Sequence, residues 1–162
     1  RHHPLRGELK AKVMQSLYAS GGAAAFDPKK FLALGGFDDL YKPFYWEDAD
    51  LSVRALARGW RILFDSQSLV EHHHETTIKR LYPLWYVKVI GDRNMLVFNW
   101  RHLAGARFWL AHLFWLPVHI TRRPLAFGLA LLKIPAVIRR RLALGRRLDI
   151  AMITDPLYHM RV

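Results

Sequence analysis

The residues best suited to chemistry lie in four short motifs in the first half of the chain. The motifs are Gly21-Gly22, Gly35-Gly36-Phe37-Asp38, Trp46-Glu47-Asp48-Ala49-Asp50-Leu51 with Arg54 and Gly59, and Val70-Glu71-His72. Carboxylates such as these can take a proton from a hydroxyl group, and histidines can bind a metal ion. Each motif alone also has a structural explanation, because glycine pairs form turns and acids in a first helical turn complement the helix dipole.

Three adjacent histidines, His72 to His74, raise the question of a zinc site. Neighbouring residues of a strand point to opposite faces, so at most His72 and His74 would share a face. A three-histidine zinc site is therefore not favoured. Asp48-Ala49-Asp50 spells a D-x-D motif, but it lies inside a helical segment, and we do not interpret it as a metal site.

Two helices are expected to position these motifs. Asp27-Pro28 predicts the start of a short helix, with aspartate as N-cap and proline in the first turn, and Gly35-Gly36 predicts its end. Residues 47–58 are predicted to form the second helix, because acids fill its first turn and apolar residues recur at helical spacing. Asp50 and Arg54 stand four residues apart, so we expect them to pair on the surface of this helix.

Short strands are expected around these helices. Residues 16–26 are predicted to form a strand of small residues interrupted by the first glycine pair, and residues 60–64 and 69–72 to form two more. From residue 77 onward the pattern of apolar residues is helical. Helix and strand alternating at this spacing favour an α/β architecture.

The order and spacing of the four motifs are more specific than any one of them. GGFD, then an aromatic residue before E-D-x-D-L-x-x-R, then V-x-H about twenty residues later, resembles the inverting family 2 glycosyltransferases of the GT-A fold. The similarity covers about residues 16–78, has a weaker echo at Arg93-Asn94, and is nearest to bacterial rhamnosyltransferase-like members that build surface polysaccharides. It implies an α/β fold: the C-terminal half of a GT-A (Rossmann-like) domain followed by apolar basic helices.

The resemblance also implies roles for single residues. An inverting transferase removes a proton from an acceptor hydroxyl as that oxygen attacks the anomeric carbon of a nucleotide sugar, and Asp48 would be this general base. Its place at a helix N-terminus would favour the ionised form. Glu47 would orient the site, and His72 resembles the histidine that helps bind the divalent metal on the donor diphosphate. The residues expected to contact substrate are Gly21, Gly22, Gly36, Trp46, Asp50 and Arg54.

Enzymes of this family normally bind the nucleotide with an N-terminal βαβ half that ends in an Asp-x-Asp strand holding Mg²⁺ or Mn²⁺. No such half precedes residue 16. The chain therefore resembles the acceptor-side portion of the fold, and we expect it alone to lack much of the donor site. The implied ligands are a nucleotide-sugar donor, a saccharide or lipid-linked saccharide acceptor, and a divalent metal.

The chain of 162 residues has a formal net charge of +12, no cysteine and 52% hydrophobic residues. This composition excludes a disulfide scaffold and a disordered chain, and it favours an anionic partner. The charge is uneven, because residues 93–148 contain eleven Lys or Arg and no Asp or Glu. We therefore expect two regions: the acceptor-side half of the glycosyltransferase domain at 1–102, and a basic, apolar, membrane-associating helical tail at 103–162.

The basic tail has three interpretations. Nucleic-acid binding is disfavoured because the tail is very apolar and shows no DNA or RNA motif, and a pair of core helices would not explain its many cations. We favour interfacial or re-entrant helices, with arginines on anionic lipid and four aromatic residues at headgroup depth: Phe108, Trp109, Phe114 and Trp115. The apolar segments 108–120 and 125–138 are each shorter than the ~20 residues that span a bilayer.

A tail of this kind places the protein peripherally, on the cytoplasmic face of the cell membrane. An anionic membrane surface is then a partner, and a lipid-linked acceptor such as a polyprenyl-diphosphate sugar fits this location. The alternative is a non-catalytic, basic membrane-binding module that retains the fold without the activity.

Overall fold

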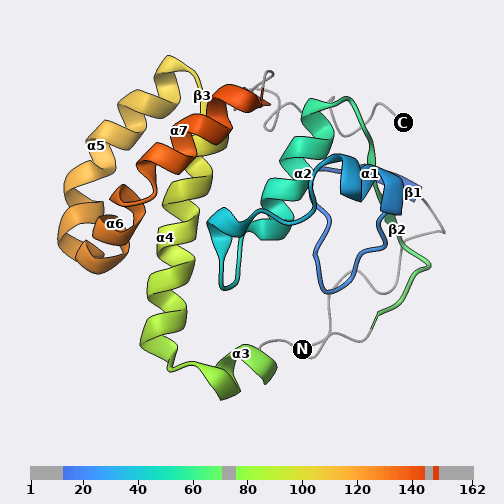
Figure 1. The fold of residues 1–162 in the computed structure, drawn as a ribbon, viewed down its shortest axis with the longest axis horizontal. Coiled ribbons are helices and arrows are strands. Elements are labelled where there is room, and N and C mark those ends of the chain that lie inside the picture. The colour runs from blue at the N-terminus through green and yellow to red at the C-terminus, as the bar shows by residue number, and fades with distance from the viewer. Residues whose placement is uncertain (1–12, 71–75, 145–147, 150–162) are drawn as a thin grey trace.

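The computed structural model describes residues 13–70, 76–144 and 148–149. Within these residues the fold combines helices with two small two-stranded sheets, a mixed helix-and-sheet architecture. In chain order (Figure 1) the elements are β1 (Val13–Ser16), α1 (Pro28–Ala33), the 3-10 helix η1 (Asp39–Tyr41), α2 (Glu47–Ala57), β2 (Ile62–Asp65), α3 (Thr76–Leu81), α4 (Leu84–His102), β3 (Leu103–Ala104), α5 (Ala106–Arg122), α6 (Pro124–Leu131), α7 (Ile134–Ala143) and β4 (Leu148–Asp149).

The short helix α1 begins and ends where the sequence predicts. The Asp27 carboxylate accepts hydrogen bonds from the backbone N–H groups of Lys29 and Lys30 at 2.9 and 3.1 Å, as an N-cap does. At the other end Gly35 and Gly36 adopt φ values of 79° and 68°, a left-handed conformation that glycine enters without steric cost. The prediction for this helix is therefore confirmed.

Helix α2 is also confirmed, with one correction to its surface. Asp50 and Arg54 do pair, with Arg54 Nε 2.7 Å from Asp50 Oδ2. The pair is not on the helix surface, however, because Asp50 is 0% exposed and Arg54 only 8%. Side chains from η1 and α4 cover this face of α2, as the hydrogen bonds of Tyr41 and His102 to Asp50 show.

The strands are fewer and shorter than expected. β1 pairs antiparallel with β2, Val13 opposite Asp65, so the predicted strand at 60–64 is confirmed in part. The predicted strand at 16–26 is wrong, because the pairing ends at Ser16 and a turn follows in which the N–H of Ala23 donates to the carbonyl of Ser20 at 3.0 Å. Of the predicted strand at 69–72, residues 69–70 lie outside any strand and the others fall outside the described residues.

Helix α4 lies in the middle of the view in Figure 1, with α2 and η1 on one side, α5 and α6 on the other, and α7 crossing over it toward α2. Its buried side chains form one core with residues from both sides. The members are Leu40, Tyr41, Leu96, Val97, Trp100, Ala130 and Val137. Helices from the two regions expected from the sequence, before and after residue 102, therefore share a single hydrophobic core.

Arginines of the acid-free stretch reach back to groups that come earlier in the chain. Arg140 and Arg101 both bond to the carboxylate of Asp38. One Nη atom of Arg141 lies 2.6 and 2.8 Å from the carbonyl oxygens of Trp100 and Leu103 at the end of α4. Part of the positive charge is thus neutralised inside the fold, which the count of charges along the sequence does not reveal.

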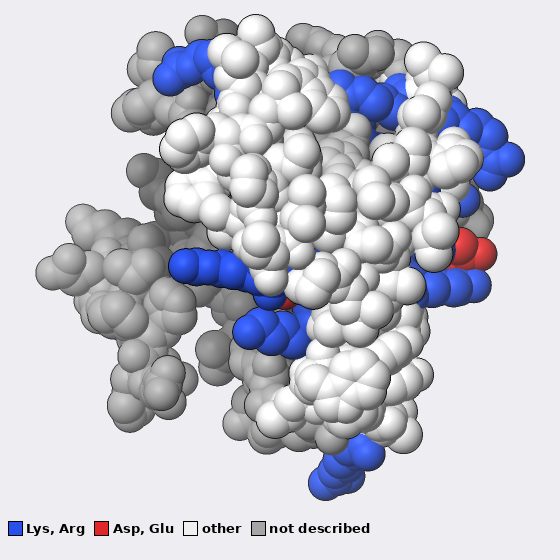
Figure 2. Space-filling view, turned by 90° about the vertical axis from the view of Figure 1, so that its left-hand side faces the viewer, with Lys and Arg blue, Asp and Glu red and all other residues white. Residues whose placement is uncertain are grey.

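Helix α5 is the most exposed element of the basic region. Phe108 is its single buried residue among those the structure describes, whereas Leu110, Leu113 and Phe114 are 67%, 60% and 76% exposed. Figure 2 views this side of the molecule and shows a broad face of uncharged residues with lysine and arginine at its margins. Among the described residues, no helix combines the length and apolar character needed to cross a bilayer.

Candidate functional site

The turn that leads into α2 has a strained backbone. Tyr45 and Trp46 adopt φ values of 70° and 77°, which residues with a side chain rarely do. The side-chain amide of Asn94, fully buried in α4, lies 2.7, 2.8 and 3.0 Å from the carbonyl oxygens of Tyr41, Phe44 and Tyr45. Strain of this kind persists only where surrounding contacts hold it, and here Asn94 supplies them.

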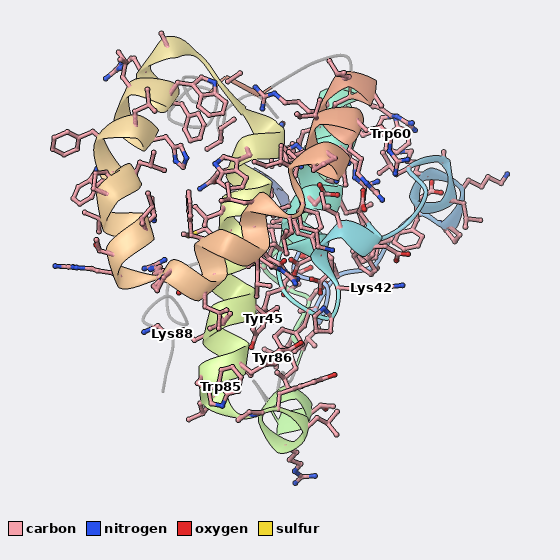
Figure 3. All side chains as sticks on the ribbon, turned by 60° about the vertical axis from the view of Figure 1, so that its left-hand side comes forward. Lys42, Tyr45, Trp60, Trp85, Tyr86 and Lys88 are labelled. Carbon is pink, nitrogen blue, oxygen red and sulfur yellow. The ribbon has the colours of Figure 1, made fainter. Side chains whose placement is uncertain are left out.

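The ring of Tyr45 also packs against α4 (Figure 3), because a Cβ atom added to Gly91 would lie 3.7 Å from Cδ2 of Tyr45. Arg93 bonds to the amide oxygen of Asn94 and to the carbonyl of Lys42, and so orients that amide. The weak sequence echo at Arg93-Asn94 therefore corresponds to a support for the turn before Glu47. Sequence alone could not show this, because the supported carbonyls lie about fifty residues away.

Asp48, the predicted general base, lies where the loop after β1 meets the first turn of α2. Its Oδ2 accepts hydrogen bonds from the Tyr18 hydroxyl at 2.5 Å and from the Gly21 N–H at 3.0 Å. Its Oδ1 accepts from the N–H of Ala49 at 2.8 Å. Ser52 fastens the same junction, because its hydroxyl accepts from Ala19 N and donates to the carbonyl of Asp48.

The predicted glycines have different surroundings. A Cβ on Gly21 would lie 3.5 Å from Asp48 Cβ, so the glycine backbone approaches the carboxylate closely. Gly22 is exposed in the same loop. Gly36 belongs to another contact, because its carbonyl accepts a hydrogen bond from Arg54 Nη2 at 2.7 Å. The structure therefore brings Gly21 to Asp48 and Gly36 to Arg54.

Glu47 precedes Asp48 and is half-buried. Its Oε2 is buried and has no hydrogen-bond partner within the described part of the chain. Burial raises the pKa of this carboxyl above its ordinary value of 4.5, and the neighbouring charge of Asp48 adds to the rise. A raised pKa favours the protonated form of this carboxyl at a higher pH than for an ordinary glutamate.

Tyr18 is held as a hydrogen-bond donor to Asp48. Burial first, and the hydrogen bond and charge of Asp48 next, raise the pKa of Tyr18 to about 12. The phenol therefore keeps its proton at any pH at which the protein would work. Nothing in the sequence marks Tyr18 as a partner of a carboxylate thirty residues away.

Asp50 is the hub of a buried polar network. Its Oδ1 lies 2.9 Å from the Tyr41 hydroxyl, 2.7 Å from Arg101 Nη1 and 2.6 Å from His102 Nε2, and its Oδ2 accepts from Arg54. Burial alone would raise the pKa of Asp50, but the hydrogen bond from His102 and the nearby guanidiniums outweigh it and lower the pKa. Asp50 and Arg54 were expected to contact substrate, and in this structure both contact protein groups.

Two other predicted residues are placed differently. The indole of Trp46 lies 5.0 Å from the ring of Phe98 and packs against the core, so in this structure its contacts are internal. His72, the candidate metal ligand, lies outside the described residues. Among residues 13–70, 76–144 and 148–149, no three or more His, Asp or Glu side chains gather as a metal site would require.

Comparison with known proteins adds no family to this geometry. No family model matches the chain, and no curated protein or solved structure is similar enough to count as a match.

Proposed function

We propose that the chain is the acceptor-side, C-terminal portion of an inverting, family 2-like glycosyltransferase of the GT-A fold, with Asp48 as the general base. The observation that carries the proposal is the position of Asp48. Its carboxylate sits in the first turn of α2, is separated by Glu47 alone from two residues of positive φ, and is oriented by Tyr18 and Gly21. Strained backbone next to an oriented carboxylate is typical of catalytic sites.

The hydrogen bonds of Asp48 leave room for one more donor. An ionised carboxylate has about four lone-pair positions. Tyr18 and Gly21 fill two on Oδ2, and Ala49 fills one on Oδ1. The remaining position on Oδ1 would accept the hydroxyl of the acceptor sugar, while Tyr18 and Gly21 hold the carboxylate still.

The reaction then follows from this placement. The acceptor oxygen forms a bond to the anomeric carbon of the nucleotide sugar as the bond to the diphosphate breaks, which inverts that carbon. The acceptor proton passes to Asp48 Oδ1, and the bonding electrons leave with the nucleoside diphosphate. Glu47, the neighbour of Asp48 in the first turn of α2, would orient the site.

The proposal includes Mg²⁺ or Mn²⁺ on the donor diphosphate, where the metal would neutralise the leaving group. His72 is its candidate ligand, but it lies outside the described residues, and no three-ligand cluster gathers among those that are described.

The test is transfer by the product of the complete gene, measured as release of nucleoside diphosphate with a panel of nucleotide sugars and acceptors. Asp48→Asn should lower the turnover by about 10²–10⁴-fold, the usual worth of a positioned base. Asp39→Asn is the matched control, because Asp39 is an acid with a largely exposed side chain in η1. Normal turnover by Asp48→Asn, or an equal loss in the control, would contradict the proposal.

We also propose that α5 lies on an anionic membrane surface, which would bring the site to a lipid-linked acceptor on the cytoplasmic face. The specific observation is that Leu110, Leu113 and Phe114, which share one side of α5, are all exposed. Arg107 and Arg122 stand near the two ends of the helix, where they can meet lipid phosphates.

This second proposal is tested by sedimentation with vesicles of phosphatidylcholine, with and without phosphatidylglycerol. The double variant Leu113→Gln with Phe114→Gln should reduce binding to the anionic vesicles. Leu32→Gln is the control, because Leu32 is 74% exposed but lies on α1. Unchanged binding by the double variant would contradict the proposal. Vesicle binding without any transfer by the complete gene product would favour the non-catalytic module instead.

A further inference from the structure

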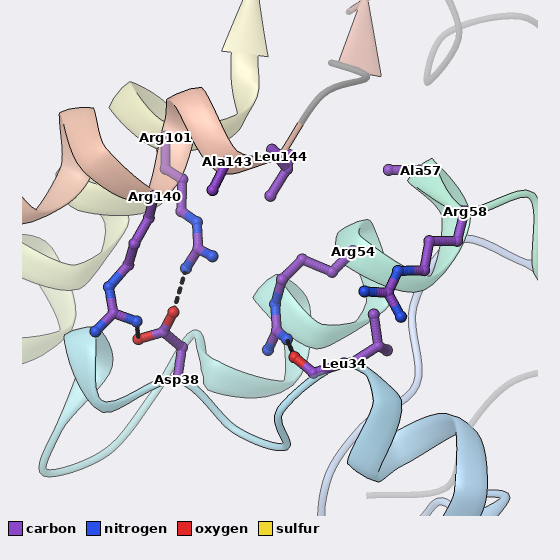
Figure 4. Close-up of a pocket in the computed structure, with 9 residues that line it drawn as sticks. All are labelled: Leu34, Asp38, Arg54, Ala57, Arg58, Arg101, Arg140, Ala143 and Leu144. Atoms are coloured by element: carbon purple, nitrogen blue, oxygen red, sulfur yellow. Dashed lines mark hydrogen bonds and ion pairs between the residues drawn. The ribbon is translucent and has the colours of Figure 1, made fainter.

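Four arginines line one half-enclosed cavity on the side of α2 that faces α7 (Figure 4). The cavity has a volume of about 240 Å³. Its lining residues are Leu34, Asp38, Arg54, Ala57, Arg58, Arg101, Arg140, Ala143 and Leu144. They come from the end of α1, the loop after it, and helices α2, α4 and α7, so the cavity exists only in the assembled fold.

The charges around this cavity do not balance. The four guanidiniums face two carboxylates, those of Asp38 and Asp50, which leaves a surplus of two positive charges. Asp38 is shared by Arg101 and Arg140, and Asp50 by Arg54 and Arg101. The two buried arginines, Arg54 and Arg101, are matched by the buried carboxylates of Asp50 and Asp38, so the surplus falls on Arg58, which is exposed, and on Arg140, whose side chain is 30% exposed. These two cations give the cavity a net positive charge that attracts an anion.

Two of these arginines also have a donor atom that the described part of the chain leaves without an acceptor. The Nε atoms of Arg101 and Arg140 are buried and have no acceptor among the described residues. Arg101 is only 4% exposed, so bulk water does not satisfy it. Buried donors of a charged group are almost always paired in folded proteins. Both side chains line the cavity, although the Nε atoms themselves are buried, so an anion in the cavity would meet the Nη groups of the guanidiniums.

We propose that this cavity binds a phosphate group, as the free dianion or as a phosphate monoester. One planar guanidinium can donate two parallel hydrogen bonds to two oxygens of a phosphate, and a doubly charged anion neutralises the two surplus positive charges of the cavity. The volume accommodates one phosphate with its bound water, since a water takes ~30 Å³ in the liquid. The site uses none of the residues proposed for proton transfer, so it does not depend on the transferase proposal.

The experiment is calorimetric titration of the protein with inorganic phosphate, with chloride used to keep the ionic strength constant. We expect saturable binding of one phosphate per chain. Arg58→Gln should weaken it about tenfold or more, because Arg58 is exposed and its loss leaves the Asp38 and Asp50 pairs intact. Arg61→Gln is the matched control, with the same change of charge at an exposed position outside the cavity.

Arg140→Gln gives a second measurement, because it removes a cavity guanidinium with a buried Nε. Circular dichroism must show that this variant folds, since Arg140 also bonds to Asp38. If it does not fold, Arg58→Gln alone decides. The absence of saturable phosphate binding, or equal weakening by Arg58→Gln and Arg61→Gln, would overturn the proposal.

Competition separates the two possible sources of the phosphate. The protein is bound to phosphatidylcholine vesicles that contain phosphatidic acid, a lipid with a phosphate monoester headgroup, and titrated with inorganic phosphate again. If the vesicles abolish phosphate binding by the parent protein, and Arg58→Gln keeps the weak binding that it shows without vesicles, a lipid headgroup is supported as the occupant. Unchanged phosphate binding on these vesicles supports a soluble phosphate compound.

Discussion

The hydroxyl of Tyr18 donates a 2.5 Å hydrogen bond to Oδ2 of Asp48. The two residues lie thirty positions apart, and their contact joins the loop after β1 to the first turn of α2. The hydrogen bond fixes which oxygen of Asp48 faces the loop. Among the described residues only Ala49 donates to Oδ1, and this is the oxygen that we propose an incoming hydroxyl would meet.

Tyr18→Phe should lower the free energy of unfolding by about 1 kcal/mol, since a hydrogen bond to a charged group contributes about 1.5–3 kcal/mol and this one is partly exposed. The measurement is urea unfolding. Tyr82→Phe is the control, because Tyr82 is a half-buried tyrosine that contributes its ring to aromatic contacts. The prediction fails if the two variants are equally stable. In the complete gene product, Tyr18→Phe should also reduce transfer, but less than Asp48→Asn does.

Gly36→Ala should destabilise the protein more than Gly35→Ala. Both glycines have positive φ, so alanine costs each about 1–2 kcal/mol in backbone strain. At Gly36 the new Cβ would also lie 3.2 Å from the ring of Phe31, whereas at Gly35 nothing lies within 4 Å. Thermal unfolding of the two variants measures the difference, and equal melting temperatures would show that Phe31 moves aside freely.

Asp50→Asn should cost about 3–5 kcal/mol of stability, because it leaves Arg54 and Arg101 buried without their shared anion. Asp39→Asn should cost about 0–1 kcal/mol, because the Asp39–Lys42 pair has both side chains 70% exposed. Both changes remove one negative charge, so urea unfolding of the two variants separates burial from charge. A small effect of Asp50→Asn would mean that the network rearranges around the amide.

Acidification should begin to destabilise the fold below pH 6.5. Burial lowers the pKa of His102 below its ordinary 6.5, so the unfolded chain binds a proton that the folded chain does not. The stability is therefore complete above pH 6.5 and is lost as the pH falls toward the lowered pKa, by at most about 1.4 kcal/mol per pH unit. The lowered pKa values of Asp38 and Asp50 act only below about their ordinary 3.8.

The variant His102→Gln isolates this effect, since its side-chain amide can still donate to Asp50. Unfolding free energies measured from pH 7.5 to 4.5 should fall less steeply for the variant than for the parent protein. His112 also has a lowered pKa, because of burial and its neighbour His119, so His112→Gln measures its separate share. Parallel pH profiles for the parent and His102→Gln would contradict the assignment.

Local features of the fold were predictable from the sequence because local interactions determine them. Asp27 caps α1 and a glycine pair ends it, and α2 starts at its acids, as their spacing indicates. The strand predicted at 16–26 fails for a local reason too: a turn at Ser20 interrupts the extended chain, and β1 lies before it.

The partners of the site residues could not be predicted, because each depends on packing between distant elements. Asp50 and Arg54 show the i,i+4 spacing of a surface pair, and only the position of α4 against α2 buries them. Asn94 lies in the helical region that the sequence predicts from residue 77 onward, but that prediction does not reveal that its amide holds carbonyls near Tyr45. A count of charges along the sequence is misleading in the same way, because Arg101 and Arg140 have no acid nearby in sequence but bond to Asp38 in the folded protein.

The bond between Asp38 and Arg140 spans 102 positions of the chain. A ribosome adds roughly 5–20 residues per second and releases the chain from its N-terminal end. Several seconds therefore pass between the synthesis of Asp38 and that of its last partner, Arg140. During this time the cavity is open and α4 lacks the apolar cover of α6 and α7. This part of the fold can therefore be completed only after Arg140 has been synthesised.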